Sequence, residues 1–192
     1  MTDRRTLLIG LGASLCAGPA FAGPRFKPLF DGRSLAGWDP VGDANWTVTE
    51  GAIVADKGGV SFLVSRVSYR DFDLRAEFWV SAEANSGIFI RCSDRAEITS
   101  ANAYEVNIFD TRPDPTYGTG AIVDVAKVSP MPKAGGQWNT MLIQARGDRF
   151  TVTFNGRKTV DSARDGKHPA GPIALQYGAG VVKFRKVEIR SL

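Results

Sequence analysis

Arg91 and Glu105 form the pair of side chains whose types and positions best suit acid–base chemistry. A carboxylate transfers protons, and a guanidinium stabilises negative charge that develops on an oxygen atom. In the alternating pattern of two expected strands, Arg91 shares a face with Phe89, and Glu105 shares a face with Asn107. If these strands pair through the connection 93–103, both groups lie on the open face of one sheet. The alternative interpretation is a cross-strand ion pair on an exposed face.

A second carboxylate follows Glu105 closely. Glu105, Asn107 and Asp110 have the spacing i, i+2, i+5, which is similar to the Glu-x-Asp-x-x-Glu signature of retaining endo-glucanases, where two carboxylates flank a glycosidic bond. Residues separated by an odd number point to opposite faces of a strand, so Asp110 joins Glu105 only if a bulge intervenes. Otherwise Asp110 is expected to cap the turn into Thr111.

Histidine and metal chemistry are limited by the composition. One histidine among 192 residues excludes a multi-histidine metal site within one chain and leaves few routes to Ser-His or Cys-His nucleophilic catalysis. That residue, His168, lies between Lys167 and Pro169 in a polar segment, where an exposed loop histidine is expected. We assign no metal: loop oxygens remain possible Ca²⁺ ligands, but no Asp-x-Asp-x-Asp pattern occurs.

The first 22 residues are expected to be an export signal. Arg4 and Arg5 precede an apolar run from Leu7 to Leu15, and Ala20-Phe21-Ala22 offers small residues for cleavage. The run is too short for a stable membrane span. The paired arginines also fit the twin-arginine pattern. We therefore expect cleavage after Ala22 and a periplasmic or secreted domain over 23–192, without a transmembrane segment.

The net charge and the cysteine content limit the classes of binding partner that we expect and predict the state of the remaining thiol. The formal net charge is +4, and it falls to +3 when Asp3, Arg4 and Arg5 leave with the signal. The positive residues alternate with apolar ones instead of forming a block, so we expect a solvated sheet face and no nucleic-acid partner. Cys92 is then the only thiol left, and it is expected to be a buried small hydrophobe.

The elements that must position these groups are strands. Residues 72–80 alternate apolar and polar side chains, residues 149–154 do the same, and Asn155-Gly156 then predicts a tight hairpin turn into 157–160. A change of parity near Arg185 and Lys186 predicts a bulge in the last strand. The remaining expected strands span 46–49, 52–55, 61–65, 87–92, 104–109, 121–125, 138–145, 172–176 and 181–189.

This pattern predicts an all-β protein of one domain, a two-sheet antiparallel β-sandwich or jelly roll. The longer loops are expected at 94–102, 111–119 and 126–137. Two tryptophans, Trp46 and Trp138, have rings that are able to stack on a sugar, although single tryptophans in strands more often serve packing.

The order of short motifs along the chain resembles the 3-keto-disaccharide hydrolase domain family. No single motif is specific, but their sequence and spacing extend over about 160 residues. They are Phe30-Asp31-Gly32 with Gly37-Trp38, Trp46-Thr47-Val48, Asp71-Phe72-Asp73-Leu74, Asn85-Ser86-Gly87-Ile88 with Arg91, Tyr104 to Asp110, Thr119 to Ile122, Trp138-Asn139, Phe154-Asn155-Gly156 and Gly171-Pro172-Ile173 with Leu175-Gln176.

The resemblance implies a concanavalin-like β-sandwich that acts on 3-keto-glycosides. A ketone at C3 acidifies the proton on C2, and its removal allows the C1 substituent to leave before water adds. We expect Glu105 to transfer this proton and Arg91 to stabilise the enolate oxygen. Asn107, Asp110, Gln176 and Tyr177 are expected to bind the sugar.

Three positions depart from the family pattern. Relatives commonly carry a histidine after the Leu-Gln pair, where this chain continues Tyr177-Gly178, and they commonly have Gln at Asn107 and Tyr at Val123. A non-catalytic carbohydrate-binding module of the same fold is therefore the alternative to a glycoside-cleaving hydrolase or lyase. The sugar, its linkage and the oligomeric state are left open by the sequence.

Overall fold

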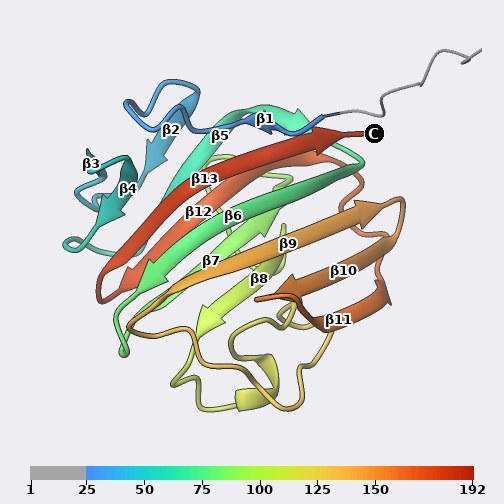
Figure 1. The fold of residues 1–192 in the computed structure, drawn as a ribbon. Helices are drawn as coiled ribbons and strands as arrows, with labels where there is room; N and C mark the ends of the chain where they lie inside the picture. The colour runs from blue at the N-terminus through green and yellow to red at the C-terminus, as the bar shows by residue number, and fades with distance from the viewer. Residues whose placement is uncertain (1–24) are drawn as a thin grey trace, which may run out of the picture.

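The computed structural model describes residues 25–192, so the expected export signal and its cleavage after Ala22 lie outside the described residues. The described chain folds into two antiparallel sheets that pack face to face (Figure 1). The predicted all-β sandwich is confirmed. Among residues 25–192 the one helical element is the short 3-10 helix η1 (Pro115–Tyr117). In 25–192 no helix has the length and apolar character needed to cross a membrane.

The larger sheet has eight strands. Seven follow the order β11-β10-β9-β6-β13-β4-β3, and β1 pairs with β13 beside them. Their bounds are β1 (Lys27–Pro28), β3 (Thr47–Thr49), β4 (Ala52–Ala55), β6 (Phe72–Val80), β9 (Trp138–Arg146), β10 (Arg149–Phe154), β11 (Arg157–Arg164) and β13 (Val182–Ser191).

The smaller sheet has five strands in the order β2-β5-β12-β7-β8. They are β2 (Trp38–Val41), β5 (Ser61–Tyr69), β12 (Gly171–Ala179), β7 (Asn85–Ile90) and β8 (Tyr104–Phe109). Alternation places one set of side chains of each strand between the sheets, where they form the main apolar core with residues such as Phe72, Phe78 and Ile88.

The predicted hairpin turn, the predicted bulge and the predicted burial of Cys92 are all present in the structure. Asn155 and Gly156 both have positive φ, as the tight turn between β10 and β11 requires. The register of β13 against β6 shifts between Arg185 and Glu188, and Lys186 has a φ of 48°, so the predicted bulge is present. Cys92 is a buried free thiol, as expected. Burial raises its pKa to about 12.

One predicted strand is absent, and two strands escaped prediction. Within 121–125, Ile122 forms only isolated bridges with Val106 and Ala126. Hydrogen bonds tie this segment to the outer edge of β8 nevertheless, because the amides of Gly120 and Val123 donate to the carbonyls of Asn107 and Glu105. The short strands β1 and β2 contain Pro28 and Pro40, which obscure the strand pattern in the sequence.

Candidate functional site

Glu105, Asn107 and Gln176 lie together on the outer face of the smaller sheet. In the register, Glu105 is opposite Phe89, while Gly87 is opposite Asn107 on one side and Gln176 on the other. Residues opposite one another in neighbouring strands point to the same face. Three of the predicted polar site residues therefore meet around Gly87.

Gly87 leaves room for this cluster because it has no side chain. A Cβ at Gly87 would stand 3.2 Å from Gln176 Oε1 and 3.4 Å from Glu105 Cγ. These two side chains therefore approach each other over the glycine. The Asn85-Ser86-Gly87 motif is recognisable in the sequence, but the role of Gly87 in the site depends on pairing across three strands, which a linear pattern does not reveal.

The amide oxygens of Asn107 and Gln176 have no hydrogen-bond partner within the described residues, although both are buried. The other side of the Asn107 amide is fixed, because its Nδ2 donates a 2.7 Å hydrogen bond to the carbonyl of Tyr117. A buried acceptor without a partner costs free energy. The two acceptors belong to strands on either side of β7, and each is able to accept a hydrogen bond from a hydroxyl donor.

Glu105 is the titratable group of the cluster. The residue is only 9% exposed. Burial raises the pKa of its carboxyl to about 7, with Arg112 lowering the pKa and Asp124 raising it. Such a carboxyl exchanges protons near neutral pH, as an acid–base catalyst must. Arg112 and Asp124 were missed by the sequence analysis because they belong to loops that fold back beside β8.

Apolar side chains border the cluster. Phe62 and Phe89 pack edge to face with their ring centroids 5.2 Å apart. They belong to a small apolar cluster, separate from the main core, that also contains Ile98 from the predicted loop 94–102. This loop is joined to Asp124 through the hydroxyl of Ser100, which donates a 3.3 Å hydrogen bond. The surroundings of Glu105 are thus partly dry, which explains its raised pKa.

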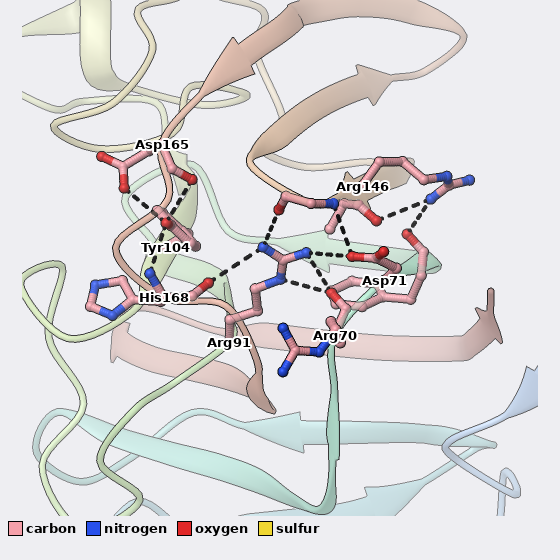
Figure 2. A network of polar contacts seen from close by, with 10 residues as sticks. Arg70, Asp71, Arg91, Tyr104, Arg146, Asp165 and His168 are labelled. Atoms are coloured by element: carbon pink, nitrogen blue, oxygen red, sulfur yellow. Dashed lines mark hydrogen bonds and ion pairs between the residues drawn. The ribbon is translucent and has the colours of Figure 1, made fainter.

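Arg91 does not join Glu105, so the predicted convergence of the two groups is wrong. Arg91 follows the end of β7 with a φ of 54°, which breaks the strand alternation. Its guanidinium packs over the ring of Phe150 from the opposing sheet, 5.1 Å from the ring centroid. It donates hydrogen bonds of 2.8 Å to the Arg70 carbonyl, 2.7 Å to the Gly147 carbonyl and 3.1 Å to Asp71. Figure 2 shows Arg91 between Arg70 and Asp71 in this network.

His168 belongs to the same network and is half-buried, whereas an exposed loop histidine was expected. Its main-chain amide donates a 3.0 Å hydrogen bond to the hydroxyl of Tyr104, which in turn donates to Asp165 (Figure 2). Its carbonyl accepts a 3.4 Å hydrogen bond from Arg91. This end of the sandwich is a structural junction of three turns.

Asp110 and Tyr177 also differ from their predicted role as sugar ligands. The Asp110 carboxylate accepts hydrogen bonds from the amides of Ala134 and Gly135 and from the hydroxyl of Thr119, so it holds the loop 126–137 against the end of β8. Tyr177 follows Gln176 directly in β12, and alternation turns its side chain into the core, where it is 4% exposed. Only Glu105, Asn107 and Gln176 remain together.

Across residues 25–192, no group of three or more His, Cys, Asp or Glu side chains is arranged to hold a metal ion. The cluster offers one carboxylate and two amide oxygens. Hydrogen bonding to hydroxyl groups and proton transfer are the chemistry that these three side chains support directly.

Three of the solved structures that resemble this chain carry names of glycosyl hydrolases or of a carbohydrate-binding module. A Parabacteroides distasonis protein described as a candidate glycosyl hydrolase is 25% identical, with a TM-score of 0.71 over 88% of this chain and 100% of that one. A second such protein from the same organism is 18% identical, with a TM-score of 0.74 over 87% and 94%. The carbohydrate-binding module CBM66 from Bacillus subtilis is 21% identical, with a TM-score of 0.66 over 81% and 96%.

The two structures that are 18% and 21% identical to this chain show a shared fold and nothing more. No curated protein matches the sequence of this chain. The family model described as the 3-keto-alpha-glucoside-1,2-lyase-like domain, however, matches residues 25–190. This match confirms the resemblance drawn from the sequence motifs. The chain therefore belongs to the 3-keto-alpha-glucoside-1,2-lyase-like domain family and has a carbohydrate-related role.

Proposed function

We propose that this protein cleaves 3-keto-glycosides, with Glu105 as the proton-transfer group. The observation that carries the proposal is the cluster over Gly87: a buried carboxyl with a pKa of about 7 beside two buried amide oxygens that have no partner within the described chain. Family membership supplies the substrate class. The amide oxygens of Asn107 and Gln176 accept hydrogen bonds from sugar hydroxyls in this proposal.

The reaction balances as an elimination followed by addition. The Glu105 carboxylate removes the proton from C2, which leaves an enolate with its negative charge on the C3 oxygen. The enolate electrons then re-form the C3 carbonyl and create the double bond between C1 and C2, and the bond from C1 to the leaving oxygen breaks. The proton held by Glu105 then passes to that oxygen, which releases the aglycone alcohol. Water adds across the double bond to give the free 3-keto sugar, so the net reaction is hydrolysis.

Arg91, the residue first expected to stabilise the enolate oxygen, cannot do so, because its guanidinium donates hydrogen bonds to main-chain carbonyls. Arg112 is the arginine whose charge acts on Glu105. It makes no ion pair within the described residues, so it is the replacement that we propose for stabilising the enolate oxygen. Export through the signal at 1–22 would place this reaction in the periplasm or outside the cell.

The decisive experiment compares a 3-keto-disaccharide with its unoxidised parent as substrates of the protein. Turnover of the keto sugar alone is expected, and Glu105→Gln should remove it while circular dichroism and the unfolding midpoint confirm the fold. Asn107→Ala and Gln176→Ala should mainly raise KM. Unchanged turnover in Glu105→Gln would exclude Glu105 from the mechanism.

A second candidate function, a non-catalytic carbohydrate-binding module, is favoured by one observation. The family's common histidine, two residues after the Leu-Gln pair, is replaced in this chain by Gly178, which has no side chain. In that case the keto sugar binds saturably without turnover, and Gln176→Ala weakens binding. Titration of the protein with the 3-keto-disaccharide, together with the turnover assay, therefore separates the two functions.

A further inference from the structure

A cavity lies on the outer face of the larger sheet, away from the Glu105 cluster. Its volume is about 490 Å³, and it is lined by side chains of β3, β4, β9 and β13, including Thr47, Val54, Trp138 and Lys183. Trp138 is 39% exposed and is one of four large hydrophobic residues with substantial exposure in the described chain. An exposed tryptophan beside a cavity is a feature of ligand sites.

Four of the lining residues belong to one row across five neighbouring strands, in which Trp79 of β6 is the fifth member and does not itself line the cavity. Thr47 is opposite Val54, Val54 is opposite Lys183, Lys183 is opposite Trp79, and Trp79 is opposite Trp138. Strands β4, β13, β6 and β9 lie side by side across this sheet (Figure 1). With about 4.8 Å between strands, the row extends about 19 Å, enough for an oligosaccharide of several rings.

Trp79 and Trp138 each have a basic side chain over the aromatic ring. The guanidinium of Arg185 lies 3.8 Å from the ring centroid of Trp138, and Lys183 Nζ lies 5.0 Å from that of Trp79. Arg185 is itself fixed by Glu77, with a distance of 2.7 Å between Nε and Oε2. The Trp138 ring is thus oriented before any ligand arrives, which lowers the entropic cost of binding.

The charge of the lining favours a neutral ligand. Two basic residues, Lys183 and Arg185, face two acidic ones, Glu50 and Asp56, around the cavity. The remaining polar lining consists of hydroxyl and amide side chains such as Thr47 and Asn45. A tryptophan ring packs against the C–H face of a sugar, and hydroxyl and amide groups pair with sugar hydroxyls. We propose that the cavity beside Trp138 binds a neutral oligosaccharide, at a site distinct from the Glu105 cluster.

Trp46, the other tryptophan singled out in the sequence, does not share this role. Its indole donates a 3.1 Å hydrogen bond to the Ser61 hydroxyl, and the side chain packs against the core. The indole of Trp138 makes no hydrogen bond within the described residues and remains available to a ligand.

The test uses unoxidised cellohexaose, maltohexaose and xylohexaose in separate titrations of the whole protein, followed by calorimetry and tryptophan fluorescence. At least one is expected to bind at millimolar concentration. Trp138→Ala should weaken that binding by about tenfold, as loss of one aromatic contact predicts, and Trp138→Phe should restore most of it. Val67→Ala removes a 57% exposed apolar side chain elsewhere and is the control that should have no effect.

Glu105→Gln separates this proposal from the proposed function, since it should remove turnover of the keto sugar and leave hexasaccharide binding unchanged. Loss of binding in Glu105→Gln would instead assign the ligand to the Glu105 cluster and overturn the second site. Full affinity in Trp138→Ala, or no binding of any of the three hexasaccharides, would also overturn it.

Discussion

The amide oxygen of Gln176 lies 3.2 Å from the point at which a Cβ on Gly87 would stand, so this side chain uses the space that the glycine leaves open. Gly87→Ala is therefore expected to displace the Gln176 amide and the Glu105 side chain. Turnover should fall by at least about tenfold, while overpacking lowers the free energy of unfolding by about 1–2 kcal/mol. Steady-state kinetics and urea unfolding measure the two effects.

Gly166→Ala is the matched control, because nothing lies within 4 Å of a Cβ placed there. It should change neither turnover nor unfolding. Full activity in Gly87→Ala would show that the position of Gln176 does not matter to catalysis.

The proton-transfer role of Glu105 predicts a pH profile for the reaction. The group must be ionised to remove the C2 proton, and its pKa is raised to about 7. The rate constant kcat/KM should therefore rise with pH up to a plateau, with half of the plateau value near pH 7. A profile whose rising limb lies near pH 4.5 would indicate an ordinary exposed carboxylate as the base.

The same shift makes Glu105 a source of pH-dependent stability. Its pKa is higher in the folded state than the ordinary value of 4.5, so the folded protein binds the proton more tightly. This stabilisation is complete below about pH 4.5 and is lost as the pH rises through about 7, with a total of about 3 kcal/mol. Urea unfolding between pH 4 and 8 should show this loss in the wild type.

Glu105→Gln should remove that part of the pH dependence, since glutamine does not titrate. Glu97→Gln, at an exposed position, controls for the change in net charge. Identical pH dependence in the wild type and Glu105→Gln would contradict the raised pKa.

Arg91 is predicted to matter for stability and not directly for chemistry. Arg91→Met removes the donors to the Arg70 and Gly147 carbonyls and leaves Asp71 without this partner. The free energy of unfolding should fall by about 3 kcal/mol, because Arg91 is buried and its removal breaks a network of partly buried hydrogen bonds. Chemical denaturation measures this loss.

Arg66→Met is the comparison, since the Arg66 side chain is 63% exposed in its ion pair with Asp39. It should cost at most about 1 kcal/mol. If Arg91→Met were equally mild, the network at this end of the sandwich would not be a structural junction.

Asp110 is predicted to hold a loop in place. Asp110→Ala deprives the amides of Ala134 and Gly135 of their acceptor, which should cost about 1–3 kcal/mol. Amide hydrogen exchange should accelerate at these two residues more than in β10. Unchanged exchange at Ala134 together with a raised KM would restore Asp110 as a substrate ligand.

The sequence predicts the strands of this fold well because alternation is a local property. The hairpin at Asn155-Gly156 and the bulge at Lys186 follow from backbone conformations that few residues adopt. The site is predicted only in part. Glu105 and Asn107 share a face by simple parity, and Gln176 joins them through strand pairing that no local pattern specifies.

The errors have equally physical causes. Arg91 lies one residue beyond its strand, where a positive φ reverses the direction that parity predicts. Tyr177 was grouped with its neighbour Gln176 on the strength of a family motif, although adjacent strand residues point to opposite faces. Arg112 and Asp124 approach Glu105 through loop closure, which depends on the whole fold.

Residues 120–123 lie along the outer edge of β8 and cover it. Main-chain groups of Glu105 and Asn107 on the outer edge of this strand are already paired with residues 120–123, and the Phe109 amide donates to the Thr119 hydroxyl. An unpaired strand edge is a template for aggregation. The edge of the strand that carries the proposed catalytic carboxylate is thus covered by the same chain. A strand of another molecule would therefore not find these main-chain groups free for hydrogen bonding, so the sheet is protected from edge-to-edge association there.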